Sequence, residues 1–144
     1  MHRPGVGHLL HLIKERSLTN ICIACHDAVD SLLNALANAR FQQISLFFPD
    51  PWPKKRHHRR RFVTPEHLAP LHRVMKPGAE LRVATDIKDY VRQTLERVPA
   101  HGFEWLAEGP GDWRAPWGDW VSTRYEQKAL REARTPHYLT FRRL

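Results

Sequence analysis

The chain has 144 residues, of which 42% are hydrophobic and 26% are charged, and its formal net charge is +8 at pH 7. This length fits one domain with its own core, and the composition is that of an ordinary globular protein. No apolar run approaches the roughly 20 residues of a membrane-spanning helix, and no signal-peptide pattern opens the sequence, so we expect a cytoplasmic protein with no membrane partner. Two cysteines are too few for the disulfide framework of a small secreted domain.

The first part of the chain alternates between helical and strand patterns. Apolar residues at helical spacing follow Pro4 and predict a helix that reaches Ile13. Residues 21–25 then predict a strand. Asp27 is suited to cap the next helix, whose apolar face falls within 29–36. Residues 44–48 predict a second strand.

The second part continues this alternation, which is typical of an α/β fold. A helix is expected to begin at Thr64 and to end at Pro77 and Gly78. Thr123 and Glu126 have capping-box spacing for a later helix, which Thr135 and Pro136 end. The other expected elements are a strand over 81–85, a helix over 91–98, a strand over 103–107, a Trp-rich loop over 108–120 and a last strand over 138–141. No repeat or linker divides the chain, so residues 1–144 are expected to form a single domain.

Three carboxylates follow three predicted parallel strands, namely Asp27, Asp50 and Asp86. The carboxyl ends of such strands are where open α/β sheets bind ligands. Taken singly, Asp27 could serve only as a helix cap and Asp86 only as a turn residue. Asp50 is the least ordinary of the three, because Pro49 and Pro51 enclose it in a rigid extended segment that cannot form its own helix cap.

A basic arm, which we define as residues Lys54 to Arg61, follows Asp50 almost at once. It holds six of the chain's 23 Lys and Arg residues. Six phosphate contacts would give a salt slope on the order of −4 to −5 for a structured RNA, and Trp52 could stack on an extruded base. A solvated charge run explains the arm about equally well in isolation. Its position directly after Asp50 favours binding of a nucleic acid.

Other patterns lead to weaker hypotheses. The sequence CIACH, from Cys22 to His26, matches a haem-attachment motif, but buried apolar thiols on a strand explain it better. The ten histidines are scattered, so we expect no metal site. Trp113, Trp117 and Trp120 could form an aromatic RNA surface or could pack as a lid over the sheet.

Several segments together resemble the bacterial tRNA (guanine-N7-)-methyltransferases. They are HRPGVG from His2 to Gly7, HDA from His26 to Ala28, FFPDPWPKKRHHRRR from Phe47 to Arg61, ATD from Ala84 to Asp86, and TRYEQKALRE from Thr123 to Glu132. The resemblance implies a Rossmann-like α/β fold that uses S-adenosylmethionine to methylate a variable-loop guanine of tRNA. It also implies an N-terminally truncated domain, because the family has a first strand-loop-helix and a second strand ahead of the stretch that matches His2. A longer protein, a truncated product and an oligomer whose partner strands repair the sheet would each account for this.

The resemblance also assigns roles to individual residues. It implies that Asp27 contacts the cofactor and that Asp50 is the active-site carboxylate, near both the cofactor and the guanine. The substrate-binding residues that it implies are Lys54, Asp86, Thr123, Arg124, Tyr125 and Glu126, and the RNA-binding residues are Arg56, His57, His58, Arg59, Arg60 and Arg61. The alternative is a non-catalytic RNA-binding remnant that has lost the cofactor loop.

Overall fold

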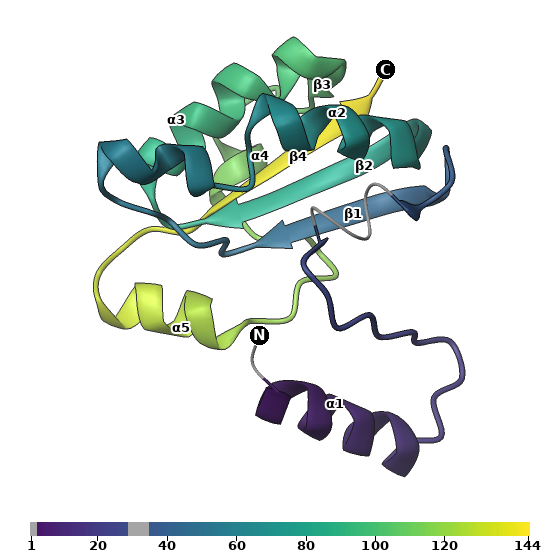
Figure 1. Ribbon diagram of the computed structural model, residues 1–144. Helices are drawn as coiled ribbons and strands as arrows, with labels where there is room; N and C mark the ends of the chain where they lie inside the picture. The colour runs from purple at the N-terminus through teal and green to yellow at the C-terminus, as the bar shows by residue number, and fades with distance from the viewer. Residues whose placement is uncertain (1–2, 29–34) are drawn as a thin grey trace. The chain divides into compact units, whose positions relative to one another are not determined.

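The computed structural model describes residues 3–28 and 35–144. The chain divides into two compact units, Met1–Ala35 and Leu36–Leu144. The first unit contains helix α1 (Arg3–Glu15), which confirms the helix expected after Pro4 (Figure 1). The single domain expected over 1–144 stays a prediction.

The strand expected over residues 21–25 is wrong. These residues have no regular secondary structure, and no described strand pairs with them. A strand needs a hydrogen-bonded neighbour, so a short apolar run does not form one by itself. The thiols of Cys22 and Cys25 are consequently exposed rather than buried. The helix expected after Asp27 lies mainly outside the described residues.

A four-stranded sheet with the order β1-β2-β4-β3 organises the second unit. Strands β1 (Phe41–Phe47) and β2 (Met75–Thr85) are parallel, and Ile44 pairs with Leu81. Strands β4 (His137–Arg143) and β3 (Phe103–Trp105) continue the sheet in antiparallel pairs. The parallel pair matters for function, because both of its strands end at the same edge of the sheet.

Helices lie on both sides of this sheet (Figure 1). Helices α2 (Pro65–Val74) and α3 (Lys88–Arg97), with the short 3-10 helix η3 (Pro99–His101), lie over one face. Helix α5 (Arg124–Arg131) lies on the other side. The remaining helical segments are the 3-10 helix η2 (Lys55–Arg60) and the four-residue helix α4 (Gly111–Arg114). The core includes Leu68, Leu71, Val74, Leu81, Val83, Leu139 and Phe141, all buried to about 1% exposure or less.

Helix α2 ends earlier than expected. It stops at Val74, and the next residue, Met75, pairs with Phe41 at the start of β2. Pro77 and Gly78 instead lie where the β1–β2 register shifts, and Gly78 there adopts a left-handed φ of 78° that favours glycine. Across the described residues, no helix is long and apolar enough to cross a membrane.

Candidate active site and nucleic-acid interface

The parallel strands bring Asp50 and Asp86 to one cleft. Asp86 directly follows β2, and Asp50 lies three residues beyond the end of β1. The cleft has a volume of about 180 Å³ and is lined by Phe48, Pro49, Asp50, Pro51, Asp86, Ile87, Tyr125, Lys128 and Arg134. Both predicted carboxylates therefore line one cleft, on the edge of the sheet where open α/β folds bind ligands.

The segment that carries Asp50 has an unusual backbone. Phe48 and Trp52, on either side of Pro49–Pro51, adopt left-handed φ angles of 46° and 39°. Such conformations cost about 1–3 kcal/mol each for non-glycine residues, so surrounding contacts must hold them. One contact is the hydrogen bond that the Phe48 amide donates to the Ala84 carbonyl oxygen at 2.7 Å. Asp50 itself is exposed and lines the cleft.

Asp86 is paired within the cleft. Its side chain is 10% exposed and accepts a hydrogen bond from Nε of Arg134 at 2.5 Å. Arg134 also donates to Glu132 through Nη1. The sequence did not single out Arg134 or the nearby Lys128, because their approach to the cleft depends on how the segment after β3 crosses the sheet.

The segment from Thr123 to Glu126 forms the start of helix α5, with Thr123 as its N-cap. The Thr123 side chain caps the helix by accepting a hydrogen bond from the Glu126 amide at 3.1 Å, as the capping-box spacing predicted. Arg124 and Tyr125 are exposed, and the Tyr125 ring stacks on Phe48 with centroids 6.5 Å apart. Tyr125 therefore forms one wall of the cleft that contains Asp50.

Glu126 points into the protein. It is 5% exposed, and its carboxylate accepts hydrogen bonds from Nε1 of Trp120 at 3.0 Å and from the hydroxyl of Tyr138. Burial raises the pKa of Glu126, but hydrogen bonds from Ser122, Tyr138 and Trp120 outweigh burial and lower the pKa overall. The carboxylate is thus an internal acceptor that fixes the start of α5 to the sheet.

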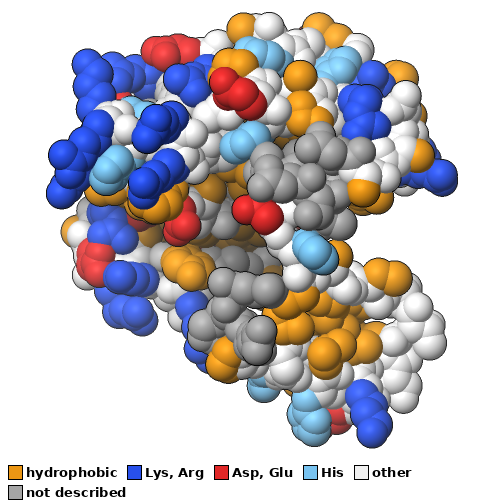
Figure 2. Space-filling model, viewed as in Figure 1, with side chains coloured by type: hydrophobic (Ala, Val, Ile, Leu, Met, Phe, Trp, Pro, Cys, Tyr) orange, Lys and Arg blue, Asp and Glu red, His pale blue; other side chains and the backbone are white. Residues whose placement is uncertain are grey.

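The basic arm is partly exposed and partly internal. Figure 2 shows Lys and Arg side chains gathered at one edge of the second unit, over η2. The exposed cations are Lys54, Lys55, Arg56, Arg59 and Arg60, and His57 and His58 are half-buried. Arg61 differs from the expectation that it engages RNA, because its side chain is only 1% exposed and its guanidinium binds within the protein.

Trp52 contacts the basic arm. The Arg60 guanidinium carbon lies 4.9 Å from the centroid of the Trp52 ring, and His57 meets the ring edge-on with centroids 5.9 Å apart. Cation–π contacts at exposed sites contribute about 0.5–1 kcal/mol. Side chains of the arm therefore already contact the ring on which an RNA base was expected to stack.

The tryptophan-rich loop packs against the sheet rather than projecting from it. Trp117 and Trp120 each contact Tyr138 with ring centroids 5.5 Å apart, and Trp117 donates to the Thr140 hydroxyl at 2.8 Å. Trp113 stacks on His137. Of the two alternatives for these residues, packing over the sheet agrees with the structure. Among the described residues, no group of three or more His, Cys, Asp or Glu side chains could hold a metal ion.

A protein-family profile described as "Putative methyltransferase" matches residues 1–139. The chain belongs to this methyltransferase family. Among solved structures, the (4+2)-cyclase SpnF superposes with a TM-score of 0.56 at 16% identity, covering 93% of this chain and 60% of that one. This match shows the fold alone, and together with the family profile it confirms the expected Rossmann-like α/β methyltransferase fold.

Curated relatives of this methyltransferase chain are far more similar in sequence. It is 65% identical over 139 residues to the tRNA (guanine-N(7)-)-methyltransferase of Ruegeria sp. (strain TM1040), covering 96% of this chain and 54% of the relative. The protein of the same name from Ruegeria pomeroyi is 66% identical over 140 residues, covering 97% and 59% respectively. The chain thus spans little more than half the length of these relatives.

The structure brings some of the expected methyltransferase residues together and leaves others apart. Asp50, Asp86 and Tyr125 line one cleft of the second unit. Asp27 is exposed in the first unit, so its expected contact with the cofactor stays a prediction. Lys54 opens the basic arm and is exposed, four residues beyond Asp50.

Proposed function

We propose that this protein transfers a methyl group from S-adenosylmethionine to N7 of a guanine in tRNA. The observation that carries the proposal is that Asp50 and Asp86 line one cleft, and that the exposed basic arm begins four residues after Asp50 in the chain. The relatives' printed names supply the tRNA and the guanine N7 atom.

The cleft suits part of such a reaction complex. Its volume of about 180 Å³ is below the roughly 300–1,000 Å³ of a complete small-molecule site. It can hold the reacting portion of a ligand, and an exposed carboxylate beside the aromatic rings of Phe48 and Tyr125 fits a cationic group. In this proposal Asp50 contacts the cofactor, which when bound supplies a methyl group on a positively charged sulfur. A cofactor contact by Asp27, in the first unit, stays a separate prediction.

Guanine N7 needs alignment rather than a strong base. Its lone pair lies in the plane of the ring and carries no proton, so no proton has to leave before methyl transfer. Asp50 can accept hydrogen bonds from the N1 and N2 hydrogens of guanine together, because a carboxylate has two acceptor oxygens. Asp50 therefore positions the base, and holding two reactants in line can supply a large part of a rate enhancement.

The remaining site residues divide into direct and indirect contacts. Lys54, Arg124 and Tyr125 are exposed and suited to touch the substrate. Thr123 is hydrogen-bonded to the Glu126 amide and the Glu126 carboxylate to Tyr138, so these contacts hold the start of α5 and keep Tyr125 at the cleft. Asp86 binds the substrate as part of its pair with Arg134.

The phosphates of the tRNA would bind along the exposed part of the basic arm. The arm contributes the exposed cations Lys55, Arg56, Arg59 and Arg60 as phosphate contacts. The half-buried His57 and His58 are further RNA-binding candidates of the arm. We also place the protein in the cytoplasm, where tRNA is modified. An oligomer is part of the proposal as well, since β1 lies at one end of the described sheet and pairs there only with β2.

The test is transfer of labelled methyl from S-adenosylmethionine to unmodified tRNA by the 144-residue chain. The tRNA is then digested and analysed for N7-methylguanosine. We expect transfer by the natural sequence, loss of transfer in Asp50→Ala, and a lowered rate in Asp50→Asn. The exposed variant Arg142→Met, which lies on β4 away from the cleft, is the control. Binding of tRNA without any transfer would instead identify an RNA-binding remnant.

A further inference from the structure

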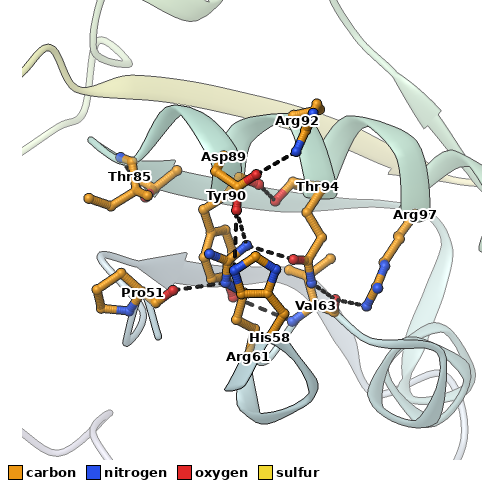
Figure 3. Close-up of polar contacts among 12 residues, drawn as sticks. Pro51, His58, Arg61, Val63, Thr85, Asp89, Tyr90, Arg92, Thr94 and Arg97 are labelled. Atoms are coloured by element: carbon orange, nitrogen blue, oxygen red, sulfur yellow. Dashed lines mark hydrogen bonds and ion pairs between the residues drawn. The ribbon is translucent and has the colours of Figure 1, made fainter. Parts of the chain in front are cut away.

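Arg61, the last residue of the basic arm, has surroundings unlike those of the cations before it (Figure 3). Arg61 is 1% exposed, whereas Arg59 and Arg60, its neighbours in sequence, are exposed. Arg61 directly follows η2, its amide donates to the His58 carbonyl oxygen one turn earlier, and both side chains approach Asp89. The arm therefore has an inner face as well as an outer one.

The Arg61 guanidinium joins three parts of the fold. Its Nε donates to the carbonyl oxygen of Pro51 at 2.8 Å, and its Nη1 donates to Oδ2 of Asp89 at 2.8 Å and to Oε1 of Gln93 at 2.7 Å (Figure 3). Pro51 directly follows Asp50, and Asp89 and Gln93 lie on α3. One side chain thus links the segment that carries Asp50 to the helix that begins two residues after Asp86.

Helix α3 also holds the chain just beyond the arm. Gln93 donates through Nε2 to the Val63 carbonyl oxygen at 2.8 Å, and Arg97 donates to the same oxygen at 3.1 Å. The Val63 amide donates to the hydroxyl of Tyr90 at 3.4 Å. The chain before the arm, at Pro51, and after it, at Val63, is therefore fixed to one helix, and Arg61 makes the connection to Pro51.

The charges around Arg61 favour this internal arrangement. A buried cation requires a partner, and Asp89 supplies the negative charge. The hydrogen bond from Arg61 holds the pKa of Asp89 below its usual value. Burial raises this pKa, but the hydrogen bonds from Arg61 and Arg92 together outweigh burial. The guanidinium also lies over the Tyr90 ring, 5.2 Å from its centroid, and burial raises the pKa of Tyr90 to about 12. A phosphate would have to displace all of these contacts to reach Arg61.

We infer that Arg61 is a positioning residue that fixes the Asp50 segment to α3, and that it does not bind RNA phosphate. The left-handed φ angles of Phe48 and Trp52 show why such a contact is needed, since that backbone is strained. The inference rests on the proposed function for its catalytic consequence, but the structural link can be measured independently.

Lysine should not be able to perform the linking role of Arg61. The guanidinium fork presents Nε to Pro51 and Nη1 to Asp89 and Gln93 at the same time. An ammonium group is a single point charge at the end of a flexible stem, so it would satisfy one side of this link and release the other. Arg61→Lys keeps the net charge of the arm and thus separates positioning from electrostatic attraction.

The experiment compares Arg61→Met, Arg61→Lys and Gln93→Leu with Arg59→Met and Arg142→Met in the 144-residue chain. The first measurement is hydrogen–deuterium exchange over residues 47–52 and α3. We expect faster exchange in the Arg61 variants and also in Gln93→Leu, which removes the same link from the α3 side. Exchange should be unchanged in Arg59→Met and Arg142→Met. Exchange at the natural rate in Arg61→Lys and Gln93→Leu would overturn the inference, and these two variants suffice should Arg61→Met fail to fold.

The second measurement is tRNA affinity as a function of salt, together with methyl-transfer kinetics. Arg59→Met should reduce the magnitude of the salt slope by about 0.7–0.9, the value for one phosphate contact, and Arg61→Lys should leave it unchanged. Arg61→Lys should lower kcat by about 10- to 100-fold, as a small misplacement of reacting groups does, with KM for tRNA maintained. A raised KM with kcat maintained would assign Arg61 to RNA binding and overturn the inference.

Failure of the proposed function would be visible separately. A natural chain that transfers no methyl group, or binds no tRNA, would contradict the proposed activity. The exchange measurement would still decide whether Arg61 fixes the Asp50 segment, because it requires neither tRNA nor cofactor.

Discussion

Arg134 donates a hydrogen bond from Nε to Oδ2 of Asp86 at 2.5 Å, although 48 positions separate the two residues in the chain. The Asp86 side chain is 10% exposed and the Arg134 side chain 37%. This ion pair joins the end of β2 to the segment after α5. Asp86 and Arg134 both line the cleft, as does Tyr125 at the start of α5. The pair therefore connects the end of β2 to the α5 side of the cleft.

Arg134→Gln should destabilise the protein and loosen the cleft. Asp86 would lose a charged hydrogen bond, a change that typically costs about 1.5–3 kcal/mol, with the lower end expected here because Arg134 is partly exposed. The measurement is the free energy of unfolding in urea. Arg142→Gln is the matched control, because Arg142 pairs with Glu104 across 3.4 Å in a pair that is half exposed on both sides. A loss no larger than that of the control would mean that the Asp86 pair contributes little.

Thr123→Ala should weaken the start of α5. The Thr123 side chain accepts from the Glu126 amide, and loss of such a cap costs about 0.5–2 kcal/mol. Thr123→Ser keeps the hydroxyl and should retain most of the stability. Thermal and urea unfolding of both variants measure this difference, and equal destabilisation by Ala and Ser would show that the methyl group of Thr123 matters rather than its oxygen.

Local patterns predicted the parts of the site that depend on local chain geometry. The Thr123 cap was correct because a helix cap involves residues three positions apart. The Glu126 carboxylate does not complete a capping box, because it accepts from Trp120 and Tyr138 instead. Asp50 and Asp86 were expected at one edge because each follows an apolar run, and β1 and β2 are indeed parallel. The run over 21–25 was equally apolar but has no described partner strand, which its own sequence cannot reveal.

Long-range contacts account for what the sequence did not predict. Arg61 looks like any other cation of the basic arm, yet its partners Asp89 and Gln93 lie 28 and 32 positions away on α3. The same holds for Arg134 and Asp86. A run of like charges can be divided into exposed and buried members only after the helix that accepts the buried one has been placed.

Glu126 should make stability depend on pH in the acid range. Its pKa is lowered from a usual value of 4.5, because hydrogen bonds outweigh burial. A carboxyl group with a lowered pKa in the folded state stabilises the fold above its unfolded pKa, and this contribution disappears as the pH falls through the folded value. The stability of the natural chain should therefore decline below about pH 4.5, and Glu126→Gln should decline less.

The measurement is the free energy of unfolding of both chains between pH 7 and pH 3. At pH 7 Glu126→Gln should be the less stable by about 1–3 kcal/mol, because the Tyr138 hydroxyl and Trp120 Nε1 lose a charged acceptor. The difference should shrink toward pH 3. Glu104→Gln, on the exposed edge of β3, serves as the control and should change stability by less than about 0.5 kcal/mol. A difference between Glu126→Gln and the natural chain that stays constant with pH would contradict the assignment.

The exposed cations of the basic arm should determine the salt dependence of tRNA binding. Four of them, Lys55, Arg56, Arg59 and Arg60, are assigned to phosphate, which corresponds to a slope of about −2.8 to −3.6. Arg59→Glu combined with Arg60→Glu should weaken affinity by about 10- to 100-fold at 0.1 M salt and flatten the slope by about 1.4–1.8. Fluorescence anisotropy with labelled tRNA at several salt concentrations measures both quantities.

The fold should survive this double charge reversal, because neither Arg59 nor Arg60 is buried. Arg60 also covers the ring of Trp52, so its replacement releases that ring as well as a charge. Trp52→Leu separates the two effects: it removes the aromatic surface but leaves every charge, and should therefore change affinity without changing the salt slope. A flattened slope in Trp52→Leu would instead mean that the Trp52 ring holds Arg60 in the orientation that reaches phosphate.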